Sequence, residues 1–268
     1  MKSKSVIIYI YYSSDSSDYN LDFFVKKELT YKDNIDYVIV INGYNCNITI
    51  PTLDNLTILR RENTGYDFGG HYYALEYIKE KIYDYYFFMN SCVIGPIIPH
   101  YFKEPHWSNI FIKKINDKVK LVGTTIVCLP YTDPGGYGPK VEGFFFMVDS
   151  IGLELLKKQQ TIFCNHPNKY SAIVNGEYGL SYCILKHGYS IDCMLPQYQN
   201  IDWRNRIYYN LNNNIHPSRK NSFYGKSINP YDVIFHKWYW HGQDNVNYDI
   251  IDQHVKQCQN IENMNREL

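Results

Sequence analysis

The chain has 268 residues, of which 45% are hydrophobic and 20% are charged, as is usual for a folded protein that needs no disulfides. Its 27 basic residues balance 27 acidic ones, which argues against nonspecific binding to a nucleic-acid backbone. No apolar stretch is long enough to span a bilayer, and the run over residues 6–12 is too short for a signal peptide. The seven scattered cysteines contain no Cys-x-x-Cys pair, so we expect a reducing, cytoplasmic setting.

The first half of the chain alternates apolar runs with segments of helical spacing. We predict strands at residues 6–12, 36–41, 56–59 and 85–89, and helices at residues 21–29 and 69–82. The strand runs are apolar throughout, which is typical of a sheet covered on both faces. Repetition of strand, helix and strand predicts a mostly parallel central sheet flanked by helices, in a single α/β domain.

The second half is more mixed. We predict strands at residues 119–129, 143–148 and 191–195, and helices at residues 151–158 and 177–187. Residues 130–140 are rich in Gly and Pro and predict a loop, while the polar segment 200–231 predicts a flexible flap or loop. An aromatic segment follows at residues 233–240. We therefore expect one domain over residues 1–247 and a helical tail over residues 248–268.

The segment from Asn63 to Gly70 lies between a predicted strand and a predicted helix. Its three glycines allow a tight turn and a close approach of a ligand to the backbone. A helix N-terminus favours anionic groups such as a diphosphate, and Arg61 can offset phosphate charge. Asp67 is a natural acceptor for sugar hydroxyls. The alternative is a glycine-rich turn in which Asp67 only caps the helix.

Two further segments end predicted elements with polar side chains. Asn90 and Ser91 follow the buried strand 85–89, and ligands of open α/β sheets sit beyond the carboxyl ends of strands. Glu177 opens a predicted helix and is a candidate general base on an acceptor hydroxyl. The alternatives are a simple strand-ending turn and an acid favoured by the helix dipole.

The aromatic segment near the C-terminal end offers several candidate ligand contacts. His236, together with His241, is a candidate metal ligand, and Lys237 can hold a diphosphate. Trp238, together with Trp240, can line an acceptor groove. The alternative is an aromatic terminal strand with exposed imidazoles.

The order of these segments resembles that of GT-A glycosyltransferases. In the family-two type, an Asn-x-Gly segment precedes a helix, an apolar strand ends in Asp-x-Asp, and a Glu-Asp-x-x-Leu helix follows. Asn63-Thr64-Gly65, Asn90-Ser91-Cys92 and Glu177-Tyr178-Gly179-Leu180 stand at these three places.

A nearer resemblance is to rhamnan-synthesis-F-like and related uncharacterised glycosyltransferase proteins. Those carry Asn-Thr-Gly-x-Asp-Phe-Gly, then Asn-Ser-Ser-x-x-Gly-Pro, then a Lys-Leu-Val-Gly-Thr-Thr-Ile-like strand and an Asp-x-x-Gly-Leu-Glu helix start. Matching stretches here are residues 63–69, 90–96, 120–126 and 149–154. The resemblance spans roughly residues 5 to 240.

The resemblance implies a GT-A-like fold and sugar transfer from a nucleotide-sugar donor to a glycan or polysaccharide acceptor. It implies a hexosyl- or deoxyhexosyltransferase in which Glu177 acts as the base of a direct displacement. Residues 9–15 would contact the nucleotide base. The loop 130–142 and the segment 200–231 would shape acceptor binding, with Glu142 and Trp238 as acceptor contacts. The expected donor-binding residues are Tyr9, Tyr11, Arg61, Asn63, Asp67, Gly70, Asn90, Ser91 and Lys237.

The Asp-x-Asp position departs from the family pattern because Asn90-Ser91-Cys92 contains no carboxylate. Mg²⁺ and Mn²⁺ prefer hard oxygen ligands, so metal dependence by the usual route is doubtful. If a metal binds, Asp67 or His236 must help to hold it. If none binds, Arg61, Lys237 and helix amides must stabilise the leaving diphosphate.

Two other functions stay open at the level of sequence. The first is a non-catalytic GT-A-like module that binds a sugar or a partner, which the missing carboxylates favour. The second is a nucleotidyltransferase, although residues 13–18 do not supply the basic glycine-rich loop that such an enzyme needs.

Overall fold

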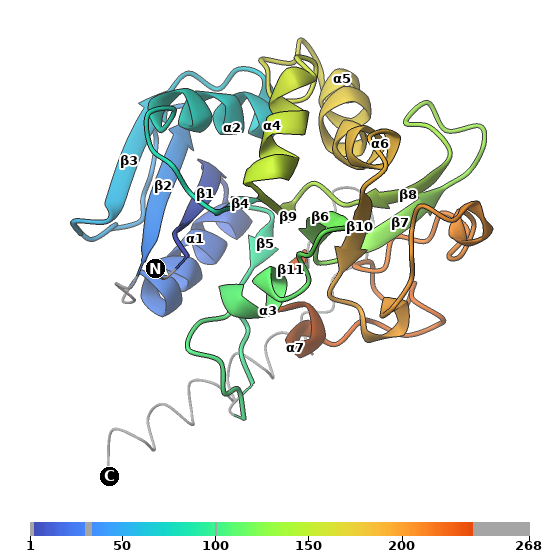
Figure 1. Ribbon diagram of the computed structural model, residues 1–268. Helices are drawn as coiled ribbons and strands as arrows, with labels where there is room; N and C mark the ends of the chain where they lie inside the picture. The colour runs from blue at the N-terminus through green and yellow to red at the C-terminus, as the bar shows by residue number, and fades with distance from the viewer. Residues whose placement is uncertain (1–2, 30–33, 100, 238–268) are drawn as a thin grey trace.

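The computed structural model describes residues 3–29, 34–99 and 101–237. These residues form a seven-stranded sheet with helices packed on it (Figure 1). All neighbouring strands are parallel except β9, which runs antiparallel to both of its neighbours. The expected mostly parallel α/β sheet is thereby confirmed. In order across the sheet, the strands are β10 (Ser190–Cys193), β6 (Val119–Gly123), β9 (Phe145–Asp149), β4 (Tyr85–Asn90), β1 (Ser5–Tyr12), β2 (Ile35–Asn42) and β3 (Leu56–Arg61).

Helices cover both faces of this sheet, as its apolar strands require. Figure 1 shows α2 (Tyr66–Tyr77), α4 (Ser150–Lys158) and α6 (Tyr178–Lys186) over one face, with α1 (Asp15–Glu28) and α3 (Ser108–Ile112) on the other. The short elements are β5 (Val93–Ile94), β11 (His236–Lys237), α7 (Pro230–Val233), η2 (Pro196–Tyr198) and η3 (Arg206–Tyr208). Within the described ranges, no helix is both long enough and apolar enough to cross a membrane.

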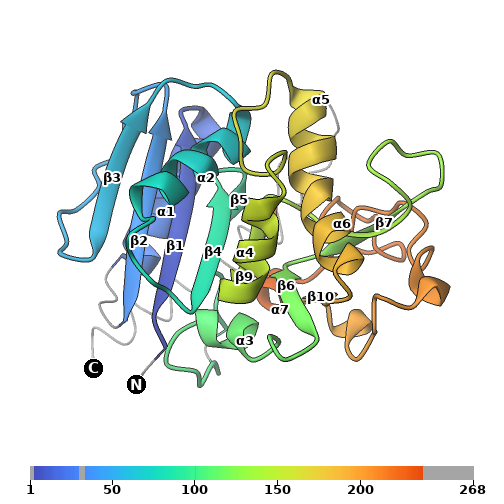
Figure 2. The ribbon, with the colours of Figure 1, turned by 45° about the horizontal axis from the view of Figure 1, so that its top comes forward.

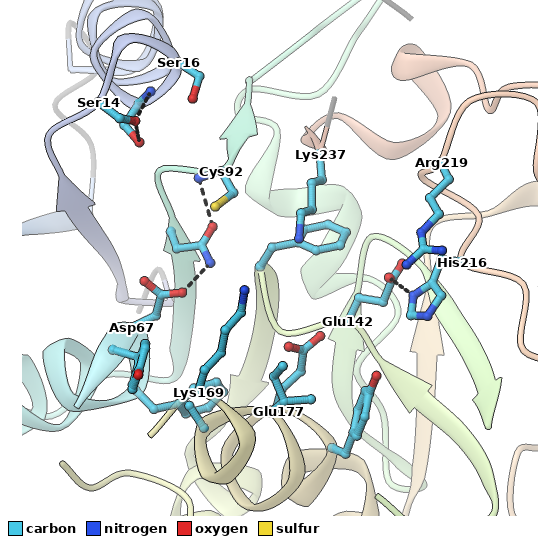
Figure 3. Close-up of a pocket in the computed structure, with 18 residues that line it drawn as sticks. Ser14, Ser16, Asp67, Cys92, Glu142, Lys169, Glu177, His216, Arg219 and Lys237 are labelled. Atoms are coloured by element: carbon cyan, nitrogen blue, oxygen red, sulfur yellow. Dashed lines mark hydrogen bonds and ion pairs between the residues drawn. The ribbon is translucent and has the colours of Figure 1, made fainter. Parts of the chain in front are cut away.

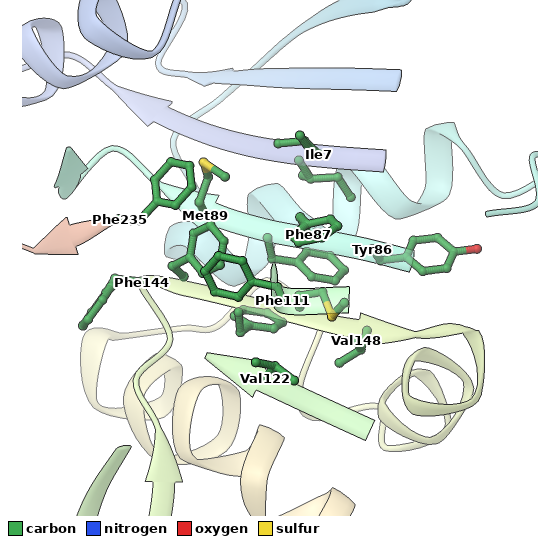
Figure 4. Packing of buried hydrophobic residues seen from close by; sticks show 14 of the residues in the cluster. Ile7, Tyr86, Phe87, Met89, Phe111, Val122, Phe144, Val148 and Phe235 are labelled. Carbon is green, nitrogen blue, oxygen red and sulfur yellow. The ribbon is translucent and has the colours of Figure 1, made fainter. Parts of the chain in front are cut away.

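Aromatic side chains of alternate residues form the two sides of the core. On one side, Phe87, which is labelled in Figure 4, contacts the ring of Trp107 directly before α3, with centroids 5.3 Å apart. On the other side, Phe88 stacks on Phe146 at 4.8 Å, beneath α2. Because successive side chains of a strand point to opposite faces, one apolar run supplies both layers.

The predicted strand 119–129 is wrong as a single element. It divides into β6 and β7 (Ile126–Leu129), and β7 pairs with β8 (Gly138–Val141) in a separate hairpin. A continuous apolar run does not reveal where a chain leaves one sheet for another. The prediction of a loop at residues 130–140 missed the start of β8, because Gly138 and Pro139 are unusual strand residues.

The helix predicted to begin at Glu177 begins earlier. A helical run passes from α5 (Lys169–Ser171) through the π-helical segment η1 (Ala172–Glu177) into α6, as Figure 2 shows. The Asn168 side chain caps its start by accepting a hydrogen bond from the Ser171 backbone N–H at 2.8 Å. Glu177 therefore lies in the middle of the run, so the helix-dipole interpretation of this acid is wrong.

The segment 200–231 is a loop, but it packs against the domain rather than forming a free flap. Trp203 is fully buried. The Asn212 amide accepts a hydrogen bond from the Cys128 N–H at 2.7 Å and donates to the Ile126 carbonyl at 2.8 Å. These bonds replace strand pairing at the free edge of β7 and fix the loop. The proposed tail over residues 248–268 lies outside the described residues.

His71 of α2 is fully buried between Phe68, Phe88 and Phe146, and neither ring nitrogen has a hydrogen-bond partner among the described residues. Burial lowers the pKa of His71 from 6.5 to about 3. The neutral ring is thus favoured in the fold, so folding stability is complete above pH 6.5 and declines as the pH falls toward 3. The slope from this one group is about 1.4 kcal/mol per pH unit.

We therefore expect His71→Leu to flatten the acid-side decline in the free energy of unfolding, measured by urea titrations between pH 7 and pH 4. Leu removes the titrating ring but keeps an apolar side chain against the aromatic neighbours. Parallel pH dependences for the variant and the wild type would show that the ring does not titrate in the way we describe.

Candidate active site

A cavity of about 410 Å³ opens at the carboxyl ends of β1 and β4 (Figure 3). This size suits a small-molecule ligand, and the position is the usual one for ligands of open α/β sheets. Its walls come from the start of α1, the start of α2, the end of β4 at residues 90–92, the helical run 169–178, and the segments around residues 142–144, 216–219 and 237. The cavity therefore gathers residues that are far apart in the sequence.

Asp67, at the start of α2, and Asn90, at the end of β4, form one side of the cavity. Gly65 precedes α2 with a φ of +72°, and a Cβ atom there would lie 2.5 Å from the Asn165 Cα atom, so only glycine fits this turn. Asp67 accepts a hydrogen bond from Asn90 Nδ2 at 2.7 Å, and Asn90 Oδ1 accepts one from the Cys92 N–H at 3.0 Å. Desolvation raises the pKa of Asp67, although Asn90 opposes the rise.

Ser14, Ser16 and Ser17 lie at the start of α1, where they line the same end of the cavity. The Ser14 hydroxyl accepts a hydrogen bond from the Ser17 N–H at 3.3 Å and so caps the helix. This capping begins α1 six residues before the predicted start at residue 21. Of residues 9–15, only Ser14 lines the cavity, and the expected contact of that range with a nucleotide base stays a prediction.

Glu177 lines the opposite end of the cavity, at the last position of the π-helical segment. Its Oε1 atom accepts a hydrogen bond from the Gly143 N–H at 3.0 Å. Desolvation raises the pKa of Glu177, with a further contribution from the charge of Glu142, while Lys237 and the Gly143 N–H oppose the rise. A carboxyl group with a raised pKa is suited to exchange protons near neutral pH.

Glu142 lies beside Glu177 but is chemically different. It is 1% exposed, and its Oε1 atom is 2.7 Å from His216 Nδ1 while its Oε2 atom accepts a hydrogen bond from Thr125 Oγ1 at 2.6 Å. Burial opposes ionisation, but the interactions with His216, together with the Thr125 hydrogen bond and the charge of Lys237, outweigh it and lower the pKa of Glu142. Two neighbouring carboxyl groups thus have pKa values shifted in opposite directions, a pattern typical of acid–base sites.

Three basic side chains complete the lining: Lys169, Arg219 and Lys237. Figure 3 shows Lys169 and Lys237 extending into the middle of the cavity from opposite walls, and Arg219 near Glu142. The Lys237 ammonium lies 5.5 Å from the centre of the Phe144 ring. Both lysines act electrostatically on the Cys92 thiol. The centre of the cavity is therefore suited to an anion.

Several predicted donor-binding residues support the site without lining it. The Arg61 guanidinium donates to the Thr64 carbonyl at 2.9 Å and to Asn165 Oδ1 at 2.9 Å, so it fixes the loop before α2. Asn63 is exposed and outside the lining. A Cβ atom on Gly70 would meet Ile10 at 2.8 Å, so this glycine serves helix–strand packing. Ser91 is buried against Ser17, with the hydroxyls 3.1 Å apart.

Three other predicted residues point elsewhere. Tyr9 is buried beneath α1, with its ring 4.9 Å from that of Phe24, and Tyr11 donates its hydroxyl to Asp18. His236 is 4% exposed and outside the lining, and burial lowers its pKa to about 4. Because successive side chains of β1 point to opposite faces, Tyr9 and Tyr11 lie on the same face, away from the cavity. The apolar sequence of the strand does not show which face its aromatic side chains occupy. Trp238 lies outside the described residues.

Sequence reasoning missed Lys169, His216 and Arg219. Lys169 follows the capping residue Asn168, which is a helix-start signal, but nothing in the sequence directs its ammonium to the cavity. His216 and Arg219 belong to a segment without periodicity, whose position depends on tertiary packing. Only the distance between Glu142 and His216 reveals that they form a pair.

The residues present do not fit a divalent metal ion. The Asp67 carboxylate is engaged by Asn90, and no group of three His, Cys, Asp or Glu side chains within the described ranges is placed to hold a metal. Cys92 is open to the cavity, but surrounding protein desolvates its thiol and raises the pKa to about 11, so the thiolate that binds metals is disfavoured. The carboxylates that Mg²⁺ and Mn²⁺ prefer are therefore not gathered at one point among the described residues.

The fold and the cavity define an α/β protein with a polar cavity at the carboxyl ends of two central strands. No protein-family model and no curated protein matches the sequence. Among solved structures, the chain is similar to one described as "Mannosyltransferase PcManGT from Pyrobaculum calidifontis in complex with GDP-Man and Mn2+", with 12% identity and a TM-score of 0.42. The match covers 72% of this chain and 55% of that chain. The assignment of a function therefore rests on the geometry of the cavity.

Proposed function

We propose that this chain transfers a sugar, of the hexosyl or deoxyhexosyl class, from a nucleotide-sugar donor to a hydroxyl group of a glycan acceptor. One observation carries the proposal: Glu177, a carboxyl group with a raised pKa, faces a cavity whose centre holds two lysine side chains. A base beside an anion site is what a displacement from a diphosphate requires. The order of the sequence motifs supports the same function.

In this proposal, Glu177 accepts the proton of the acceptor hydroxyl as that oxygen attacks the anomeric carbon. The new glycosidic bond forms while the bond between that carbon and the donor diphosphate breaks, and the nucleoside diphosphate leaves with the bonding electrons. Glu177 Oε1 is held by the Gly143 N–H, and Oε2 has no hydrogen-bond partner among the described residues. Oε2 is therefore the atom assigned to receive the proton, and a direct displacement inverts the anomeric configuration.

The polarity of the cavity orients the donor. Its serine end, with Asp67 and Asn90, offers hydroxyl, amide and carboxylate groups for the nucleoside. The diphosphate lies between Lys169 and Lys237, and the sugar extends toward Glu177. The acceptor then approaches from the side of Tyr178 and Arg219, close to the predicted acceptor contact Glu142.

We further propose that the lysines, rather than a divalent ion, stabilise the diphosphate. Lys169→Gln is expected to weaken binding of UDP or GDP at least about 10-fold, which corresponds to about 1.4 kcal/mol, because it removes one of two central charges. Titration calorimetry in EDTA and in Mn²⁺ measures this effect, with the exposed Lys158→Gln as a matched control. Binding that collapses in EDTA while Lys169→Gln stays normal would contradict this assignment.

A non-catalytic module is the second candidate, because Asn90-Ser91-Cys92 lacks the carboxylates of the family pattern. Both candidates are tested by crystals soaked with UDP-, GDP- and dTDP-sugars, including GDP-Man, with and without Mn²⁺. The proposal requires a nucleotide with its diphosphate between Lys169 and Lys237 and its sugar within reach of Glu177. An intact donor bound with its sugar remote from Glu177 would favour the module, and a donor bound outside the cavity would overturn both assignments.

A further inference from the structure

Glu142 is a buried carboxylate that joins three separate segments of the chain. It accepts from Thr125 Oγ1 at 2.6 Å, it contacts His216 Nδ1 at 2.7 Å, and its own backbone N–H donates to the Thr125 carbonyl at 3.3 Å. Placing a charged group where only 1% of its residue surface is exposed is costly unless its oxygens are satisfied. Here both carboxylate oxygens have partners. Thr125, between β6 and β7, and His216, in the segment 200–231, therefore fix the position of Glu142.

The residue that follows Glu142 is in direct contact with Glu177. Gly143 donates its N–H to Glu177 Oε1 at 3.0 Å. A Cβ atom at position 143 would lie 2.7 Å from Glu177 Cγ and 3.1 Å from its Cβ, so only glycine lets this side chain lie against the backbone. The chain is also fixed on the far side, where the Phe144 carbonyl accepts the Asn90 N–H at 3.1 Å.

We infer that Glu142, held by Thr125 and His216, is a positioning residue that uses the Gly143 N–H to aim the Glu177 carboxylate. This inference rests on the proposed function for its catalytic meaning, and it reassigns Glu142, which the sequence suggested as an acceptor contact. Because the Gly143 N–H bonds to Oε1, Oε2 is the carboxylate oxygen that remains for the cavity. Glu177 is the last residue of the π-helical segment, a type of irregularity often found at functional sites.

The charges around Glu177 come from every neighbouring element. Lys237 of β11 and His216 of the loop lower the pKa of Glu177, while Glu142 raises it. Lys169 and Arg219 line the same cavity, and its other titratable residues are Tyr66, Asp67, Cys92 and Tyr178. Changes that leave all these charges intact therefore isolate positioning from electrostatics. Thr125 and Gly143 offer such changes.

The test compares Thr125→Val, Thr125→Ser and Gly143→Ala with the wild type. Valine removes the hydroxyl donor to Glu142 and serine restores it, while alanine at position 143 pushes the Glu177 side chain away. The Glu177 carboxyl is titrated by NMR on protein labelled with ¹³C-glutamate, with its signal assigned from Glu177→Gln. We expect an upward shift of the Glu177 titration in the valine and alanine variants, because the N–H bond to the carboxylate is weakened, and none in the serine variant.

Turnover provides the second readout. Gly143→Ala is expected to lower kcat about 10-fold or more with little change in donor KM, and to cause no further loss when Glu177 is already Gln. Unshifted Glu177 titrations in both the valine and alanine variants would overturn the inference, as would a full additional loss in the double variant. A wild type without any turnover would instead defeat the proposed function, and the titration would still decide the positioning of Glu177.

Discussion

Replacing Glu177 by Gln is expected to lower kcat for sugar transfer by about 10²–10⁴-fold, the usual contribution of a general base. The amide keeps the size of the side chain and can still accept the Gly143 N–H, but it cannot take a proton from the acceptor. Binding of the nucleoside diphosphate should change little, because Lys169 and Lys237 remain. Steady-state kinetics and calorimetry on the same preparations measure the two effects.

The matched control is Glu76→Gln, which changes an exposed acid of α2 outside the cavity lining and should leave kcat unchanged. Because desolvation raises the pKa of Glu177 above 4.5, the wild-type rate should fall as the pH falls through that raised value. Only ionised Glu177 can act as the base. A Glu177→Gln variant that retains wild-type turnover would remove this residue from the mechanism.

The second large effect concerns stability, at the end of the sheet remote from the cavity. Glu28 of α1 is 2% exposed and accepts hydrogen bonds from Tyr37 Oη at 2.8 Å and Trp107 Nε1 at 2.6 Å, and its carboxylate lies 2.8 Å from His106 Nε2. Glu28→Ala leaves these buried groups without their common partner. We expect a loss of about 3–5 kcal/mol in the free energy of unfolding, a large share of a typical domain's stability.

Urea denaturation monitored by tryptophan fluorescence measures this loss, since Trp107 is part of the cluster. The control Glu80→Ala replaces an exposed acid and should stay within about 0.5 kcal/mol of the wild type. A loss below about 1 kcal/mol in Glu28→Ala would show that the cluster does not hold α1 and α3 to the sheet.

The central strands could be predicted from the sequence because burial on both faces leaves a signature of unbroken apolar runs. β1, β2 and β4 lie within a residue of their expected bounds. The same signature conceals the break between β6 and β7, since Thr124 and Thr125 are as buried as the strands beside them. Where secondary structure changes without a change in burial, composition gives no signal.

The candidate site could be predicted only in part. Asp67, Asn90, Glu142, Glu177 and Lys237, which the motifs singled out, line one cavity, and their binding and catalytic roles stay predictions. The rest of the site depends on pairs of residues that become neighbours only when the chain folds. Glu142 and His216, for example, are 74 positions apart in the chain yet 2.7 Å apart in space. Arg61 holds its own turn through Thr64 and Asn165, because a basic residue beside a glycine turn can bind backbone and amide oxygens as readily as a phosphate, and its contact with a donor stays a prediction.

Release of nucleoside diphosphate from a panel of UDP-, GDP- and dTDP-sugars tests the central claim most directly. We predict that the wild type, in EDTA and with a glycan acceptor, consumes at least one donor and forms a product of inverted anomeric configuration. The Glu177→Gln protein should bind that donor and release almost none. Donor binding without release by the wild type would contradict the claim and identify a binding module, and a retained configuration would contradict direct displacement.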